Sequence, residues 1–198
     1  MLNFAKALLF IAGVSVCAIA FSGELMMSNL LLSKSRPWCI GRFMFDRPTA
    51  SEISNQRYEF EGDKLQTQYN VSLSAYRAKI EDRENELRSK KRVYPGDGKE
   101  RNHPWLEKAF SPTNDSRVFI YRDTAAEGID LPFDSEAHVY DNGTLFNITG
   151  RIGSSVIDKV VSIYDKEIRR IKARDNWTVP AESGFCFDGG IMTGSSTT

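Results

Sequence analysis

A dense apolar stretch, WCIGRFMF, occupies residues 38–45 and contains one charged side chain, Arg42. Aliphatic and aromatic residues fill both sets of alternating positions, which is typical of a strand covered on both faces. A second aromatic run, Phe185–Phe187, lies near the far end of the chain. We therefore expect residues 38–45 to form one buried strand inside a sheet, and 185–187 to form another strand.

Shorter segments alternate between apolar and polar side chains, the pattern of a half-buried strand. The segments 58–60 and 65–71 alternate on either side of a turn at residues 61–64 and so predict a hairpin. Three more strands are predicted at 118–121, 137–140 and 145–148. The last two are separated by Asp141-Asn142-Gly143, a strong signal for a tight hairpin turn.

Two segments instead show the helical period. Ser72 can cap a helix in which the apolar residues Leu73, Tyr76, Ile80 and Leu87 form one narrow stripe. Ser155, followed by Asp158, resembles a capping box at the start of a second helix. Because a hairpin precedes each helix, the order predicts an α+β domain: an antiparallel or mixed sheet with both helices packed on one face.

Residues 93–113 break both periodicities. Three prolines and two glycines exclude a long regular element, yet several side chains are large for a solvated loop. Interfaces concentrate binding energy in Trp, Tyr and Arg, and we therefore nominate Tyr94, Arg101 and Trp105 as partner-binding residues. The competing interpretation is that Trp105 and Phe110 cover the sheet.

The first 22 residues have the composition of an export signal. Lys6 precedes an apolar run over 7–21, and Ala18-Ile19-Ala20 provides a cleavage motif. We expect a signal peptide or, if it is not cleaved, an N-terminal membrane anchor. The folded domain is predicted over 37–190, and the Gly- and Ser-rich end of the chain predicts a disordered tail over 191–198.

Export changes what the cysteines imply. Outside the leader only Cys39 and Cys186 remain, an even number in an oxidising compartment, so we expect a disulfide between them. The alternative is a pair of buried free thiols. In the chain-entropy model, closing so long a loop removes about 4–5 kcal/mol of unfolded-state entropy.

The sequence lacks the residues that common chemistries require. Its 26 basic and 26 acidic residues balance, so no global field favours nucleic acid. Two histidines, His103 and His138, are too few for a zinc site, and Gly96-Asp97-Gly98-Lys99 lacks the leading glycine and the hydroxyl of a phosphate loop. Because no nucleophile can be matched to a base, we predict a protein without catalytic activity, metal or cofactor.

Five N-x-S/T sequons keep a second class of function open. In a secreted eukaryotic protein they would carry glycans, so the alternative function is a secreted or anchored glycoprotein with a structural or adhesive role. The sequons begin at Asn70, Asn114, Asn142, Asn147 and Asn176.

Both cysteine segments carry a resemblance. Trp38-Cys39-Ile40-Gly41-Arg42-Phe43, followed by Asp46-Arg47-Pro48, and Gly184-Phe185-Cys186-Phe187-Asp188-Gly189-Gly190 together resemble the immunity proteins that protect bacteria from type VI secretion lipase effectors. The resemblance implies a periplasmic, non-catalytic protein whose partner is a cognate phospholipase toxin. Members of that family continue into a second domain. This sequence ends eight residues after Gly190, so we expect a shortened member or a fragment.

Overall fold

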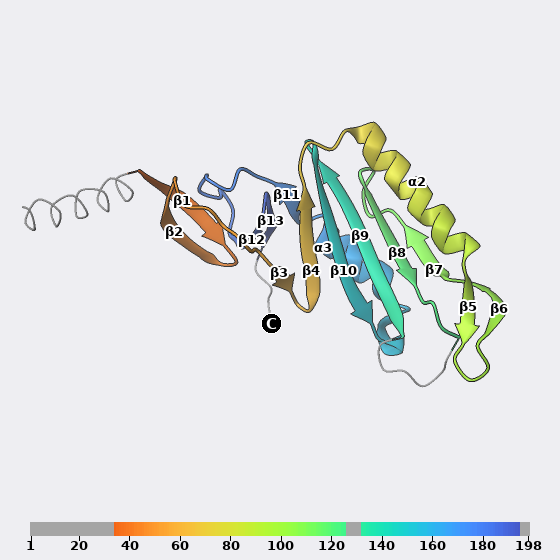
Figure 1. Cartoon of the computed structure of the whole chain (residues 1–198). Helices are drawn as coiled ribbons and strands as arrows, with labels where there is room; N and C mark the ends of the chain where they lie inside the picture. The colour runs from red at the N-terminus through yellow and green to blue at the C-terminus, as the bar shows by residue number, and fades with distance from the viewer. Residues whose placement is uncertain (1–33, 126–131, 195–198) are drawn as a thin grey trace, which may run out of the picture.

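The computed structural model describes residues 34–125 and 132–194. Its central element is a six-stranded antiparallel sheet in the order β3-β4-β10-β9-β8-β7 (Figure 1). The strands are β3 (Tyr58–Phe60), β4 (Asp63–Gln68), β7 (Leu106–Phe110), β8 (Ser116–Tyr121), β9 (Phe133–Asp141) and β10 (Thr144–Ile152). The predicted α+β class is confirmed, and so is the hairpin before each helix.

The β9–β10 turn forms where the sequence predicts it. Asp141 pairs with Thr144, while Asn142 and Gly143 have φ values of 47° and 80°. Left-handed backbone at both central positions is the geometry of a tight type I′ turn, and Asn-Gly tolerates it best. This turn aligns β9 and β10 over their whole length.

Helix α2 (Leu73–Ser89) covers one face of this sheet. As predicted, Ser72 caps the helix: its Oγ accepts the backbone N–H of Ala75 at 3.1 Å. The fully buried Leu87 packs with Leu106 and Phe119 of the sheet.

Helix α3 (Val160–Ile168) covers the opposite face. It packs with Val118 and Ile120, which flank Phe119 in β8 and therefore point away from α2. The expectation that both helices pack on one face is wrong (Figure 1). The predicted cap at Ser155 is also wrong: Ser154–Val156 forms the 3₁₀ turn η1, and α3 starts at Val160 without a side-chain cap.

A three-stranded sheet, β11-β13-β12, closes the end of the α3 core. Its strands are β11 (Ile171–Ala173), β12 (Gly184–Phe187) and β13 (Gly190–Thr193). Because Ile191 and Met192 are buried in β13, the disordered tail predicted from residue 191 is wrong as far as Thr193. Residues 195–198, and the predicted signal or anchor at 1–22, lie outside the described residues. None of the helices in the described residues has the length and apolar character needed to span a bilayer.

Residues 38–45 form a hairpin instead of one strand. Strands β1 (Ser35–Ile40) and β2 (Phe43–Pro48) pair with each other through a turn in which Gly41 has φ 57°. The hairpin is held against β12, and Phe43 on β2 is 74% exposed. The prediction of a strand covered on both faces is therefore wrong.

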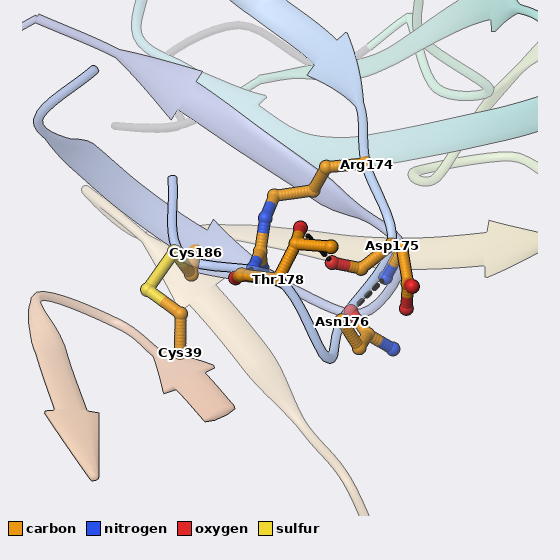
Figure 2. Close-up of a disulfide and its surroundings, with 7 residues drawn as sticks. Cys39, Arg174, Asp175, Asn176, Thr178 and Cys186 are labelled. Atoms are coloured by element: carbon orange, nitrogen blue, oxygen red, sulfur yellow. Dashed lines mark hydrogen bonds between the residues drawn. A yellow bond between two sulfur atoms is a disulfide. The ribbon is translucent and has the colours of Figure 1, made fainter. Parts of the chain in front are cut away.

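The predicted Cys39–Cys186 disulfide is confirmed, with the two Cα atoms 5.7 Å apart (Figure 2). Reciprocal backbone hydrogen bonds between Gly41 and Cys186 add a second tie, between the β1–β2 turn and β12. Trp38 packs edge-on against Trp177, with ring centroids 4.7 Å apart. The two ends of the described chain are thus held together by covalent, backbone and aromatic contacts.

The segment predicted to be irregular is largely β-structure. Strands β5 (Lys91–Tyr94) and β6 (Lys99–Pro104) form a two-stranded hairpin, and β7 is an edge strand of the main sheet. The prolines are compatible with strands because Pro95 lies in the hairpin turn and Pro104 ends a strand at an edge, where its missing N–H is not needed.

Candidate partner-binding surface

Two of the three nominated residues meet at the β5–β6 hairpin. The Arg101 guanidinium lies 4.9 Å from the centre of the Tyr94 ring, and its Nη2 forms an ion pair with Asp97 at 3.0 Å. The Lys99 N–H and Arg101 both donate to the Asp97 carboxylate and lower its pKa. Tyr94 remains 42% exposed. A tyrosine and an arginine are therefore presented together, with the arginine already positioned.

Trp105, the third nominated residue, lies where the hairpin joins the main sheet. Its indole N–H donates to the Lys91 carbonyl oxygen at 3.0 Å, and Lys90 Nζ lies 4.6 Å from the ring centre. The partly buried ring packs against the cluster that holds Leu87 to the sheet. These contacts give Trp105 a structural position, and its role in binding stays a prediction.

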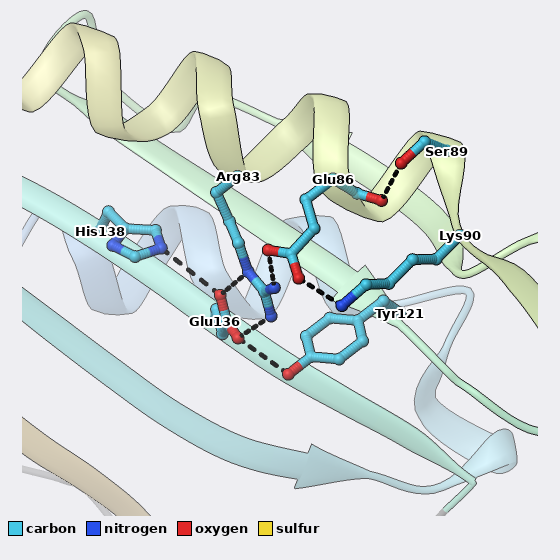
Figure 3. A network of polar contacts seen from close by, with 7 residues as sticks. All are labelled: Arg83, Glu86, Ser89, Lys90, Tyr121, Glu136 and His138. Carbon is cyan, nitrogen blue, oxygen red and sulfur yellow. Dashed lines mark hydrogen bonds and ion pairs between the residues drawn. The ribbon is translucent and has the colours of Figure 1, made fainter.

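An ionic network fills the space between α2 and the sheet (Figure 3). Arg83 of α2 forms two hydrogen bonds to the Glu136 carboxylate, at 2.9 and 2.5 Å, and Tyr121 donates to the same carboxylate at 2.8 Å. Burial alone would raise the pKa of Glu136, but contacts with His138, Arg83 and Tyr121 outweigh it and lower the pKa to about 2. Glu136 is therefore ionised at neutral pH.

This network was not predicted from the sequence, although polar and apolar residues alternate in β9 and so indicate one polar face. Glu136 and His138 share one face of β9, and Ala137 and Val139 share the other. His138 is buried and its Nδ1 lies 2.7 Å from Oδ1 of Asn147 on β10. Asn147 heads one of the sequons, and its buried side chain leaves no room for a glycan.

The β1–β2 hairpin lies at the opposite end of the molecule from the β5–β6 hairpin (Figure 1). Side chains of the β1–β2 hairpin are exposed there although they are large and apolar, namely Ile40, Phe43, Met44 and Phe45. Sequence reasoning expected these residues to be buried. Exposed patches of this kind mark contact surfaces in many proteins.

The described part of the chain was also compared with the requirements of a metal site. Among residues 34–125 and 132–194, no group of three or more His, Cys, Asp or Glu side chains is placed to hold a metal ion. His103 is exposed on β6, whereas His138 is buried on β9.

Comparison with known families decides the relationship. Residues 36–173 match the model of the Tle cognate immunity protein 4 N-terminal domain, which is well over half of the chain. The chain belongs to this family. A comparison with curated proteins finds no match.

Solved structures show the same fold. A chain of "The crystal structure of Tle4-Tli4 complex" aligns with a TM-score of 0.67 at 20% identity, over 83% of this chain and 52% of that chain. The apo immunity protein TplEi of T6SS from Pseudomonas aeruginosa aligns equally well, with a TM-score of 0.67 at 19% identity over 82% of this chain and 52% of that chain. The present chain thus spans about half the length of these relatives.

Proposed function

We propose that this protein binds a phospholipase toxin delivered by a type VI secretion system and neutralises it in the periplasm, without catalytic activity of its own. The observation that carries the proposal is the family match over residues 36–173. The fold likeness to a chain of the Tle4-Tli4 complex supports it. The disulfide supports an oxidising compartment such as the periplasm.

The glycoprotein alternative receives no support. Asn147 is buried, and the Asn176 side chain is occupied by hydrogen bonds: its Oδ1 accepts the Gly189 N–H and its Nδ2 donates to Asp188. The structure therefore gives these two sequons a role in packing.

We further propose that Tyr94 and Arg101 contact the toxin. The hairpin projects from the edge of the molecule (Figure 1), and its aromatic and guanidinium groups are held in one arrangement before binding. Preorganised tyrosine and arginine side chains lose little conformational entropy when a partner docks. That is the character of an interface hot spot.

The experiment that tests the proposed function is a pull-down of the purified protein with the product of the neighbouring gene. A stable complex with a phospholipase is expected. A neighbouring phospholipase that does not bind at micromolar concentrations would contradict the proposal.

Two matched variants test the surface. Arg101→Ala should weaken toxin binding by about 2 kcal/mol or more. Arg169→Ala is the control, because Arg169 also pairs with an aspartate four residues earlier and is exposed, but lies at the C-cap of α3. Equal affinities for the two variants would remove Arg101 from the interface.

A further inference from the structure

A cavity of ≈ 450 Å³ lies beside α3, between this helix and the β3–β4–β10 side of the main sheet. Its volume falls within the range of about 300–1,000 Å³ that is usual for ligand sites. Buried apolar side chains from the sheet, from α3 and from β13 form much of its wall, namely Leu65, Ile148, Ile152, Val160, Ile168 and Met192.

Three carboxylates also line the cavity: Glu61, Asp63 and Glu167. Asp63 lies directly over Gly150 of β10, where any Cβ would come within 1.7 Å of Asp63 Oδ1. The missing Cβ of Gly150 leaves the space that the Asp63 carboxylate occupies against β10.

The negative charge at this cavity is incompletely compensated. In residues 34–125 and 132–194, no ion pair involves Glu61, Asp63 or Glu167. Burial, followed by repulsion from Asp63 and Glu61, raises the pKa of Glu167 to about 7, although Arg170 acts in the opposite direction. Burial also raises the pKa of Asp63, with a hydrogen bond to Tyr164 opposing it.

The other charged group at the cavity is Arg151, which forms an ion pair with Asp134 at 3.7 Å. This contact engages the guanidinium with a carboxylate outside the lining. A further cation would relieve the repulsion among the lining carboxylates, whereas an anion would add to it. The apolar wall would at the same time favour a hydrocarbon chain attached to that cation.

We propose that this cavity receives a lysine or arginine side chain of the toxin together with an apolar side chain beside it. The carboxylates would bind the cationic end, and the wall around Ile148 and Ile168 would bury the apolar part. Long basic side chains combine these two properties, because their methylene stems lie along apolar surface while the charge meets a polar group. The inference rests on the proposed function, since it takes the toxin as the partner.

The first test uses n-hexylamine as a probe, with hexanoate as its anionic counterpart, in NMR titrations of the full chain at pH 8. We expect hexylamine to shift the amide signals of residues around Ile148 and Ile168 and to bind at least about tenfold more tightly than hexanoate. Its affinity should fall at pH 5, where Glu167 is protonated. Equal binding of both probes, or no shift with hexylamine, would overturn the inference.

A matched pair of variants locates the effect. Glu167→Gln keeps the shape of the side chain and removes its charge, so hexylamine binding should weaken by about tenfold at pH 8. Asp165→Asn is the control, because Asp165 is on the same helix but pairs with Arg169 and does not line the cavity. Identical affinities for the two variants would place the probe elsewhere.

The last test measures the affinity of the same two variants for the toxin itself. Glu167→Gln should reduce toxin affinity by about tenfold, and Asp165→Asn should leave it unchanged. If the wild type binds toxin and Glu167→Gln binds equally well, the proposed occupant of the cavity is wrong and the proposed function stands. If the wild type binds hexylamine but no phospholipase, the proposed function and the choice of occupant both fail.

Discussion

The two faces of the main sheet use the same strands for opposite chemistry. Towards α3, the sheet presents a continuous apolar surface that includes Val118, Ile120 and Phe146. Towards α2, it presents the Glu136 network beside a small apolar cluster around Phe119. Because neighbouring residues of a strand point to opposite sides, one sequence register sets both surfaces.

The difference follows from the helices. Helix α3 brings three buried apolar positions in nine residues, whereas α2 brings two in seventeen. A helix with so narrow an apolar stripe cannot hold its position by burial alone, and Arg83 and Glu84 bind the sheet through ion pairs. Such pairs contribute little net stability but fix geometry, so we expect the α3 face to stabilise the fold and the α2 face to position the helix.

The largest expected loss of stability comes from creating a cavity on the α3 face of the sheet. Phe146 is fully buried and packs edge-on against Phe187, with centroids 5.2 Å apart. Phe146→Ala should lower the free energy of unfolding by about 3–5 kcal/mol, measured by denaturant unfolding. Phe43→Ala, at an exposed position, is the control and should change it by less than about 0.5 kcal/mol. Similar losses for both would contradict the assignment of the core.

Trp105→Ala tests the edge of the α2 face. The indole packs on the Leu87 cluster and donates to Lys91, so we expect a loss of about 3 kcal/mol in the free energy of unfolding. If packing is the only role of Trp105, toxin affinity measured well below the melting temperature should change little. Unchanged stability with a loss of affinity would instead show that Trp105 is a partner-binding residue.

Glu136→Gln weakens the ionic contact that positions α2. The variant leaves Arg83 facing a neutral amide, at a cost of about 2–3 kcal/mol at pH 7. Because the pKa of Glu136 is lowered to about 2, its contribution is complete above its unfolded pKa of 4.5 and is lost as the pH falls towards 2. The stability difference between variant and wild type should therefore shrink across this acid range, as followed by unfolding at several pH values. A stability difference that stays constant over this pH range would contradict the role of the Glu136 carboxylate in the network.

Glu167→Gln should change the free energy of unfolding least of the four variants, and it should raise this free energy instead of lowering it. A pKa raised to about 7 means that the wild type loses stability as the pH rises from 4.5 through 7. The variant should therefore be more stable than the wild type at pH 8, by about 1–2 kcal/mol after allowance for solvent screening, and the two should converge at pH 4. A less stable variant at pH 8 would show that the carboxylate is compensated.

Sequence reasoning succeeded where the determinant is local or covalent. The Ser72 cap, the Asn142-Gly143 turn and the Cys39–Cys186 pair each depend on a few residues with restricted chemistry. It failed where the determinant is non-local. The choice of sheet face for each helix depends on which alternating set of β8 and β9 residues meets which helix, and no single segment encodes that.

Two further misses have local causes. Gly41 and Arg42 turn the chain inside an apolar stretch, and because Arg42 is the one charged residue among residues 38–45, the reversal resembles a continuous strand. In residues 93–113, prolines suggested a loop, although Pro104 is compatible with an edge strand. In the candidate surface, Tyr94 and Arg101 could be nominated from their residue types alone. Predicting the Glu136 network would have required knowing how α2 lies over β9.

Inhibition of a phospholipase through binding, the function proposed for this protein, can be tested by an activity titration. Phospholipase activity of the cognate toxin would be measured with increasing amounts of the protein and, in parallel, of Arg101→Ala. We predict a stoichiometric loss of activity with the wild type and a curve displaced to higher concentration for Arg101→Ala. Full phospholipase activity in the presence of excess wild-type protein would contradict the proposed function.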